Sequence, residues 1–198
     1  ADVMQNKGRI IAADVSAALG RTDFEAVQRC ADAILAAHAR EATIFTAGNG
    51  VSSSTAGHFV NDLLKGCRVD GRPGFRAISL ADPNAVLTCL ANDFSYDEVF
   101  ELQLATLARP GDLLVVFSGS GNSPNIVRAC LAAGAAGVTV IAFLGGDGGR
   151  VRELSELCVL APSHTMEQIE DLHLCYTHSL VHHLRSRLTE RAATRAAP

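Results

Sequence analysis

The sequence has no tryptophan, only two tyrosines and two methionines, and no apolar run long enough to cross a bilayer. The longest apolar stretches, such as Leu113–Phe117 and Val138–Leu144, fall far short of the ~20 residues that a membrane-spanning helix needs. The N-terminal segment also lacks a basic stretch followed by an apolar one, so no export leader is predicted. We therefore expect a soluble, cytoplasmic protein with no membrane partner.

Basic residues are neither in excess nor clustered. Lys and Arg total 17 against 21 Asp and Glu, which gives a formal net charge of -4. A protein that binds a nucleic-acid backbone generally carries a basic patch, because neutralising phosphates supplies most of the affinity. We therefore expect no nucleic-acid partner.

The six cysteines are scattered, and no two have the C-x-x-C spacing of a zinc knuckle or a redox pair. In a chain without an export signal they are best interpreted as small, buried apolar residues.

Short apolar runs alternate with helical segments through most of the chain, which is typical of a parallel sheet covered by helices on both faces. The spacing predicts two N-terminal helices, around Ile10–Leu19 and over Phe24–Ala39, and a last helix from Met166 to about Leu188. Thr165 and Gln168 are expected to form a capping box for that last helix. The expected strands are Thr43–Ala47, Ala77–Leu80, Leu113–Phe117, Val138–Leu144 and Leu157–Leu160.

The length of 198 residues, with no repeat and no linker, predicts one domain over residues 1–198. Both N-terminal helices, within residues 1–40, carry apolar residues around more of their circumference than one sheet face can cover. We expect them to pack between subunits of a homo-oligomer, although they would also serve to complete the core of a monomer. Residues 189–198 carry no apolar stripe and are expected to fray.

Two polar, glycine-rich loops follow the first and third expected strands, where ligands bind in open parallel sheets. The second loop, Ser118–Pro124, places three serines and two glycines before a helix that is expected to start at Pro124, with Ser123 as its N-cap. Glycines let an anion approach the backbone, serine hydroxyls donate to it, and the helix dipole favours its charge. Neither loop carries a G-K-[ST] or G-x-G-x-x-G motif, so a small phosphorylated metabolite fits better than a nucleotide; an ordinary capped turn is the alternative.

Two histidines are candidates for chemistry. His58 and Asp62 lie four residues apart on one helix face, a spacing that suits two metal ligands or a base held by an imidazole. Such a pair is more often a surface pair without function. Four of the seven histidines lie in the expected last helix, and His178 is the best functional candidate among them because Leu174 and Val181 indicate a partly buried face.

Six motifs follow one another along the chain: GNGVSSSTAGHFVNDL, RPGFRAISL, LANDFSYDEVF, FSGSGNSPNIVRA, GGDGG and EQIEDLHLCYTH. Together they resemble the sugar isomerase (SIS) domain, and within it the phosphoheptose isomerase group, over roughly residues 40–185. The resemblance implies an α/β fold, a three-layer αβα sandwich with a five-stranded parallel sheet, and a homotetramer with active sites at subunit interfaces. It also implies conversion of sedoheptulose 7-phosphate to D-glycero-D-manno-heptopyranose 7-phosphate through an enediol.

The resemblance also assigns residues to roles. It places proton transfer on Asp62 and His178. Some members bind zinc, and those ligand positions fall on His58, Asp62, Glu170 and His178. The substrate-binding positions fall on Asn49, Gly50, Val51, Ser52, Asp62, Asn92, Asp93, Ser118, Gly119, Ser120, Ser123 and Glu170.

Two positions depart from the family pattern. Asp62 stands where glutamate is usual, and Glu170 stands where glutamine is common. Either the site has contracted around the shorter carboxylate of Asp62, with Glu170 taking part in proton transfer, or the substrate differs from that of the family. Glu170 and His178 lie about 12 Å apart along a helix, so we expect Glu170 to meet His178 of a neighbouring subunit.

Three alternatives to this isomerase remain. One is a non-catalytic SIS protein that binds a partner such as the replication initiator protein, and another is a regulatory phosphosugar-binding module. A third is an isomerase for a related sugar phosphate. The presence of both Asp62 and His178 favours an enzyme, and the chain shows no helix-turn-helix segment that would accompany a regulator.

Overall fold

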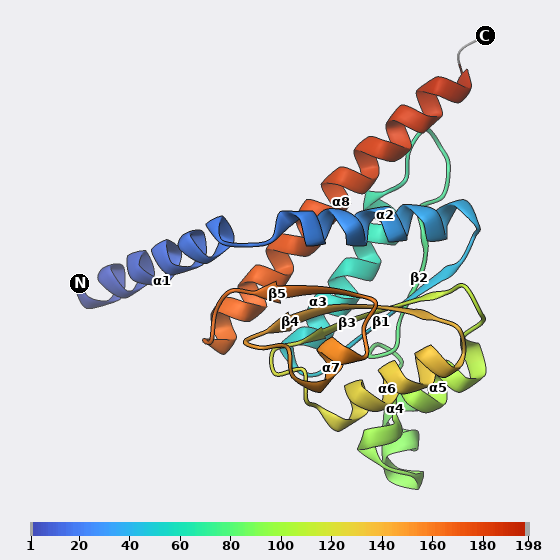
Figure 1. Cartoon of the computed structure of the whole chain (residues 1–198), viewed down its shortest axis with the longest axis horizontal. Coiled ribbons are helices and arrows are strands. Elements are labelled where there is room, and N and C mark those ends of the chain that lie inside the picture. Colours follow the sequence, from blue (N-terminus) through green and yellow to red (C-terminus); the bar gives the residue numbers. More distant parts are fainter. Residues whose placement is uncertain (1, 197–198) are drawn as a thin grey trace.

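The computed structural model describes the backbone of residues 2–196, with a five-stranded, all-parallel sheet at its centre (Figure 1). The strand order is β2-β1-β3-β4-β5. The predicted fold class is confirmed, and every strand end lies within one residue of its expected position. The strands are β1 (Thr43–Gly48), β2 (Arg76–Ser79), β3 (Leu113–Ser118), β4 (Thr139–Gly145) and β5 (Leu157–Ala161).

Helices cover both faces of the sheet and make three layers (Figure 1). Helices α2 (Phe24–Ala39), α3 (Val51–Asn61) and α8 (Met166–Ala196) pack on one face. Helices α5 (Glu101–Leu107), α6 (Pro124–Ala135) and α7 (Gly149–Glu153) lie on the other. Helix α4 (Asn84–Asp93) and the 3₁₀ turn Tyr96–Glu98 extend beyond that second layer.

Strands β3 and β4 are nearly continuous apolar runs because both of their faces are covered. Successive side chains of a strand point to opposite faces, and the two cores divide accordingly. Phe117 and Phe143 lie under α3 and α8 in one core. Val116 and Ala142, their neighbours in the chain, lie under α6 in the other.

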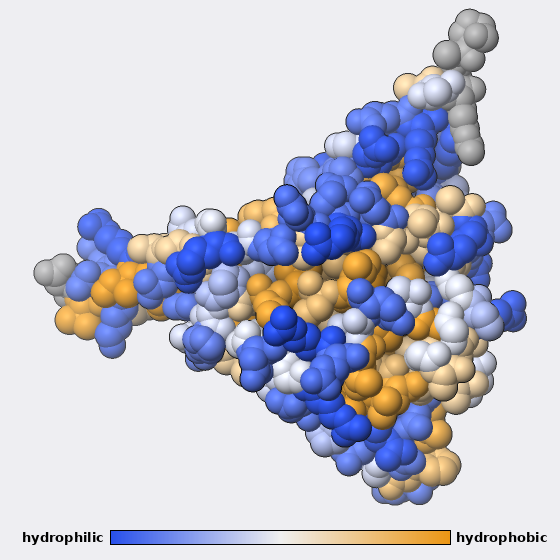
Figure 2. All heavy atoms as spheres, in the orientation of Figure 1, coloured by the Kyte–Doolittle hydropathy of each residue, from blue (hydrophilic) through white to orange (hydrophobic). Residues whose placement is uncertain are grey.

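The two N-terminal helices behave differently. Helix α2 buries seven residues in the core of its own chain. Helix α1 (Asp2–Gly20) projects away from the body, with apolar side chains along it (Figures 1 and 2). Val3 and Met4 are 70% and 80% exposed, and Ile10 and Ile11 are also exposed. The expected role in subunit packing therefore stays a prediction, and it now concerns α1 above all.

Helix α8 is longer than the sequence predicted. It continues past Leu188 to Ala196, so residues 189–196, which were expected to fray, are helical in the structure. Alanine, arginine and glutamate are strong helix formers, Ala192 is buried, and Arg187 pairs with Glu190 at 3.1 Å. The rest of the expected tail, residues 197–198, lies outside the described residues.

The start of α8 also differs from the prediction. No hydrogen bond of the expected capping box appears among the described residues. The Gln168 side chain instead accepts a hydrogen bond from the Ser163 hydroxyl at 2.8 Å, and Ser163 Oγ accepts from the Thr165 N–H at 3.1 Å. None of the described helices, α8 included, combines the length and the apolar character needed to cross a membrane.

Candidate active site

The loops after β1 and β3 lie at the carboxyl edge of the sheet, where the direction of the chain changes. These two strands are neighbours, but β1 leads into α3 on one face and β3 leads into α6 on the other. Such a change of direction opens a crevice between the two loops, and ligands of open α/β sheets bind there. Residues 49–50 and 119–123 therefore lie at the expected binding position of the fold.

The loop between β3 and α6 is a compact, serine-lined turn. The hydroxyl of Ser118 accepts a hydrogen bond from the Gly121 N–H at 3.0 Å, so this buried side chain shapes the loop. Gly121 has a φ of +64°, and an added Cβ would overlap the Gly148 carbonyl. Ser123 is the N-cap of α6 and Pro124 its first residue, as predicted. The exposed Ser120 and the half-buried Ser123 remain available to a ligand.

A reciprocal amide pair joins the two loops. Asn49 Nδ2 donates to Asn125 Oδ1 at 2.9 Å, and Asn125 Nδ2 donates to Asn49 Oδ1 at 2.8 Å. The Tyr96 hydroxyl donates to Asn49 Oδ1 at 3.0 Å, and the Ile126 N–H donates to Asn125 Oδ1. Asn125 was not among the predicted site residues, although its place directly after Pro124, in the first turn of the helix that follows the serine loop, was a usable signal. At 2% exposure, Asn125 holds the loops without reaching solvent itself.

The remaining residues of the first loop lie at the start of α3. Gly50 is its N-cap, with a φ of +56°, and Val51 is its first residue and is exposed. Ser52 is buried, with 8% of its surface exposed. Asn49, Gly50 and Val51 thus present the N-terminal end of α3 to the crevice.

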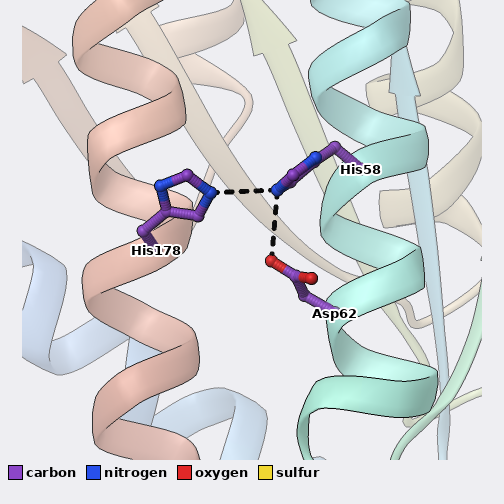
Figure 3. Close-up of side chains that lie close together, drawn as sticks. All are labelled: His58, Asp62 and His178. Atoms are coloured by element: carbon purple, nitrogen blue, oxygen red, sulfur yellow. Dashed lines mark hydrogen bonds and ion pairs between the residues drawn. The ribbon is translucent and has the colours of Figure 1, made fainter.

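A second group of side chains lies between α3 and α8 (Figure 3). His58 comes from α3, Asp62 from the π-helical turn Asp62–Gly66 that continues it, and His178 from α8. The Nε2 atoms of His58 and His178 are 2.9 Å apart, and His58 Nε2 lies 3.2 Å from Asp62 Oδ2. His58 and His178 are 120 residues apart in the sequence, and the packing of α3 and α8 brings their side chains together.

The convergence of these three groups fits a metal ion. One ligand atom from each residue lies within 4.8 Å of the other two. Tetrahedral zinc, with bonds of about 2.0–2.1 Å, places its ligand atoms about 3.3 Å apart. Two imidazole nitrogens can face each other at 2.9 Å if one donates its proton to the other, or if a cation accepts both lone pairs. The histidine and carboxylate donors suit a divalent transition metal.

Three candidate residues lie outside both groups. Glu170 is half-buried on α8 and is not among the grouped ligands of the described chain. Asn92 and Asp93 are exposed at the end of α4, where Asn92 Nδ2 donates to Asp93 Oδ1 at 2.8 Å. The described hydrogen bonds include none that connects Asn92 or Asp93 with the crevice loops or with His58.

Comparison with known proteins identifies the class first. A family model of the SIS domain matches residues 11–145, and the chain belongs to the SIS domain family. Within that family it belongs with the phosphoheptose isomerases. It is 38% identical over 152 residues to the phosphoheptose isomerase of Burkholderia pseudomallei (strain 1710b), covering 77% of each chain. The phosphoheptose isomerase of Mycobacterium tuberculosis (strain ATCC 25177 / H37Ra) is 36% identical over 168 residues, 85% of each chain.

Solved structures agree with this assignment. Phosphoheptose isomerase GmhA from Neisseria gonorrhoeae matches with a TM-score of 0.86 and 27% identity, over 93% of this chain and 100% of that one. The similarity therefore includes the helices on both faces of the sheet as well as the strands, because so little of either chain is left out.

Proposed function

We propose that the protein is an aldose–ketose isomerase that converts sedoheptulose 7-phosphate to D-glycero-D-manno-heptopyranose 7-phosphate in heptose biosynthesis. The relatives named phosphoheptose isomerase support the substrate class. The observation that carries the proposal is the meeting of a carboxylate, Asp62, with the imidazoles of His58 and His178 (Figure 3). The helical segment that carries His58 and Asp62 begins at Gly50, in the loop that Asn49 joins to Asn125 beside the serine loop.

The serine loop is the proposed phosphate site. Ser120, Ser123 and the N-terminal amides of α6 offer hydrogen-bond donors to a phosphate, which the helix dipole also favours. His58 lies seven residues after Val51 along α3, or about 10 Å along the helix axis. We infer that the sugar chain runs from the serine loop along α3 toward His58. The phosphate would thus supply binding energy far from the reacting carbons.

Isomerisation moves a proton between neighbouring carbons through an enediol, which requires a base and an acid. We assign these roles to Asp62 and His178. Asp62 Oδ2 faces His58, while Asp62 Oδ1 accepts a hydrogen bond from Asn61 Nδ2 at 3.2 Å and remains available for proton transfer. A bound divalent cation, with zinc the proposed ion, would supply charge that stabilises the developing enediolate oxygen.

We further propose a homotetramer in which Glu170 of a neighbouring subunit completes the metal site. Glu170 and His178 of one chain are about 12 Å apart along α8, which is too far for both to bind one ion without long extension. The exposed apolar side chains of α1 provide the surface that such an assembly would bury. A cytoplasmic location of the protein stays a prediction from the sequence.

Turnover of sedoheptulose 7-phosphate tests the proposal. The protein is incubated with the sugar phosphate, with and without a chelator, and the products are identified by NMR. Formation of an aldoheptose 7-phosphate supports the isomerase. Saturable binding of the sugar phosphate without any product would favour a non-catalytic phosphosugar-binding protein, and turnover of a different sugar phosphate alone would favour a related isomerase.

A further inference from the structure

A second hollow, of about 750 Å³, lies at the amino edge of the sheet, opposite the crevice. Ala42 precedes β1 and Arg76 is the first residue of β2, and both line it. Since all five strands are parallel, these positions are at the far end from the serine loop. The loop from α3 to β2 and the C-terminal half of α8 form its walls, and they lie side by side in Figure 1.

The hollow is strongly basic. Arg68, Arg72, Arg76 and Arg191 line it, and Glu41 is the single carboxylate among the lining residues. All four arginine side chains are exposed, and within the described part of the chain none forms a side-chain hydrogen bond or an ion pair. Four guanidinium groups around one space repel each other, and an anion placed between them removes that repulsion. Four arginines around one hollow are unusual in a chain whose net charge is -4.

The segment that carries these arginines is held in one conformation. Asp70 and Gly71 both have positive φ, and the Arg72 N–H donates to Val69 O at 2.9 Å, as in a tight two-residue hairpin turn. An added Cβ at Gly74 would overlap the Leu63 carbonyl oxygen, so only glycine permits this approach to the helix. The turn therefore presents Arg68 and Arg72 from a fixed backbone.

The far end of this segment is anchored in the core. The Phe75 N–H donates to Leu63 O at 3.0 Å, and the buried Phe75 ring packs against His38, with 4.5 Å between ring centroids. Leu63 belongs to the π-helical turn Asp62–Gly66, where the Cys67 N–H bonds to Asp62 O at 3.0 Å. π-Helical turns are rare and often mark functional sites. One rigid turn thus supports Asp62 on one side and the wall of the hollow on the other.

We propose that this basic hollow binds a phosphorylated small molecule at a site separate from the catalytic crevice. Its volume lies in the range of small-molecule sites, about 300–1,000 Å³. Guanidinium groups bind phosphate through paired N–H donors, and several of them suit a ligand with two or more negative charges. Leu64, Pro73 and Leu188 on the lining provide apolar surface for the carbon skeleton of the ligand.

Binding of inorganic pyrophosphate by the full-length protein tests this site, measured by calorimetry without substrate. The titration uses the variant Ser120→Asp, because a carboxylate in the serine loop repels phosphate from the crevice. We expect saturable, salt-sensitive binding in S120D. Adding Arg72→Ala and Arg191→Ala should weaken pyrophosphate binding at least tenfold, since two charge-assisted contacts are lost. Arg72→Lys keeps the positive charge but loses the paired N–H donors of the guanidinium group, so it should weaken pyrophosphate binding less.

Arg109→Ala is the matched control. Arg109 is exposed, also precedes a strand at the amino edge, and does not line the hollow, so its loss should leave binding unchanged. Binding in S120D that does not depend on Arg72 and Arg191, or no saturable binding at millimolar pyrophosphate, overturns the proposal. A changed oligomeric state of R72A/R191A in light scattering, without pyrophosphate binding to the parent, would assign the arginines to a subunit contact instead. The readout involves no turnover, so it stands whether or not the isomerase proposal fails.

Discussion

Asn49 and Asn125 exchange two side-chain hydrogen bonds, at 2.9 and 2.8 Å, across the crevice between the loops that follow β1 and β3. A pair of this kind fixes the orientation of both amides, because each provides the donor and the acceptor that the other needs. The loop proposed to contact the sugar and the loop proposed to hold the phosphate are thereby tied into one unit. Their separation is set by the protein before any ligand arrives.

Replacing Asn125 by leucine should therefore disturb binding more than chemistry. The change leaves Asn49 Nδ2 and the buried Ile126 N–H without their acceptor, which should cost about 1–3 kcal/mol of folding free energy. We expect KM for the sugar phosphate to rise about tenfold, with a smaller change in kcat. Steady-state kinetics and denaturant unfolding measure both effects. Asn84→Ala, at an exposed amide at the start of α4, is the control, and an unchanged KM in N125L would contradict the positioning role.

His178→Ala should abolish turnover and leave phosphosugar binding largely intact. Loss of a group that transfers a proton typically lowers the rate by about 10²–10⁴-fold. The serine loop is untouched, so calorimetric binding of the substrate should persist. His182→Ala removes an exposed imidazole from the same helix and should retain activity. Full activity in H178A would remove His178 from the mechanism.

The fold was largely predictable because hydrophobic periodicity decides it. The apolar runs of β3 and β4 have no other stable place than the centre of a covered sheet. The end of α8 was missed because residues 189–196 have no apolar stripe, and the prediction relied on such a stripe. Intrinsic propensity of alanine, arginine and glutamate continues a helix even where little packing supports it.

Exchange of Asp62 for glutamate tests whether the site is fitted to the shorter side chain. Asp62 Oδ2 already lies 3.2 Å from His58 Nε2, so an added methylene would push the carboxylate past its present position. A displacement of about 1 Å at a reacting group can cost on the order of a hundredfold in rate. We expect D62E to lose activity, and D62N to lose both activity and affinity for added zinc in a metal titration. A gain of activity in D62E would show that the site is not fitted to aspartate and works better with the glutamate that is usual in the family.

The candidate site was predictable only in pieces. Spacing placed His58 and Asp62 on one helix face. Only the family resemblance joined them with His178, because their meeting depends on how α3 and α8 pack. The π-helical turn after Asp62 likewise has no signature in the residues DLLKG. Asn125 pairs with Asn49 because β1 and β3 are neighbours in the sheet. The spacing of residues along the sequence does not reveal which strands are neighbours, so this pair could not be predicted from it.

Gly121→Ala should unfold the serine loop locally and weaken phosphate binding. Gly121 has a φ of +64°, and its added methyl group would overlap the Gly148 carbonyl, a backbone atom that cannot move aside cheaply. We expect a loss of about 2 kcal/mol or more of folding free energy, with reduced affinity for inorganic phosphate. Gly134→Ala, in α6 with no atom near the added methyl group, should instead be neutral or stabilising by about 0.5–1 kcal/mol. Equal stability of the two variants would refute the argument.

His173 makes the stability of the protein depend on pH. Burial lowers the pKa of this histidine from 6.5 to about 4, although its ring bonds to the Leu144 carbonyl oxygen at 3.1 Å. Between these pKa values the unfolded chain binds a proton that the folded chain does not, so the free energy of unfolding falls as pH falls. The contribution is fully present above the unfolded pKa, and about 2 kcal/mol of it is lost by about pH 5.

His173→Gln keeps a donor for the Leu144 carbonyl and removes the titrating ring. Urea unfolding at about pH 7 and about pH 5 should therefore show a drop in unfolding free energy that is about 2 kcal/mol smaller in H173Q than in the parent. His182→Gln, which replaces an exposed imidazole of the same helix, controls for the loss of a histidine as such. The buried aromatic side chains Phe117, Phe143 and Tyr176 lie next to the ring, with centroid distances of 6.0, 6.4 and 6.3 Å. An identical drop in parent and H173Q would mean that the folded protein accommodates the charged ring, which the apolar surroundings of His173 argue against.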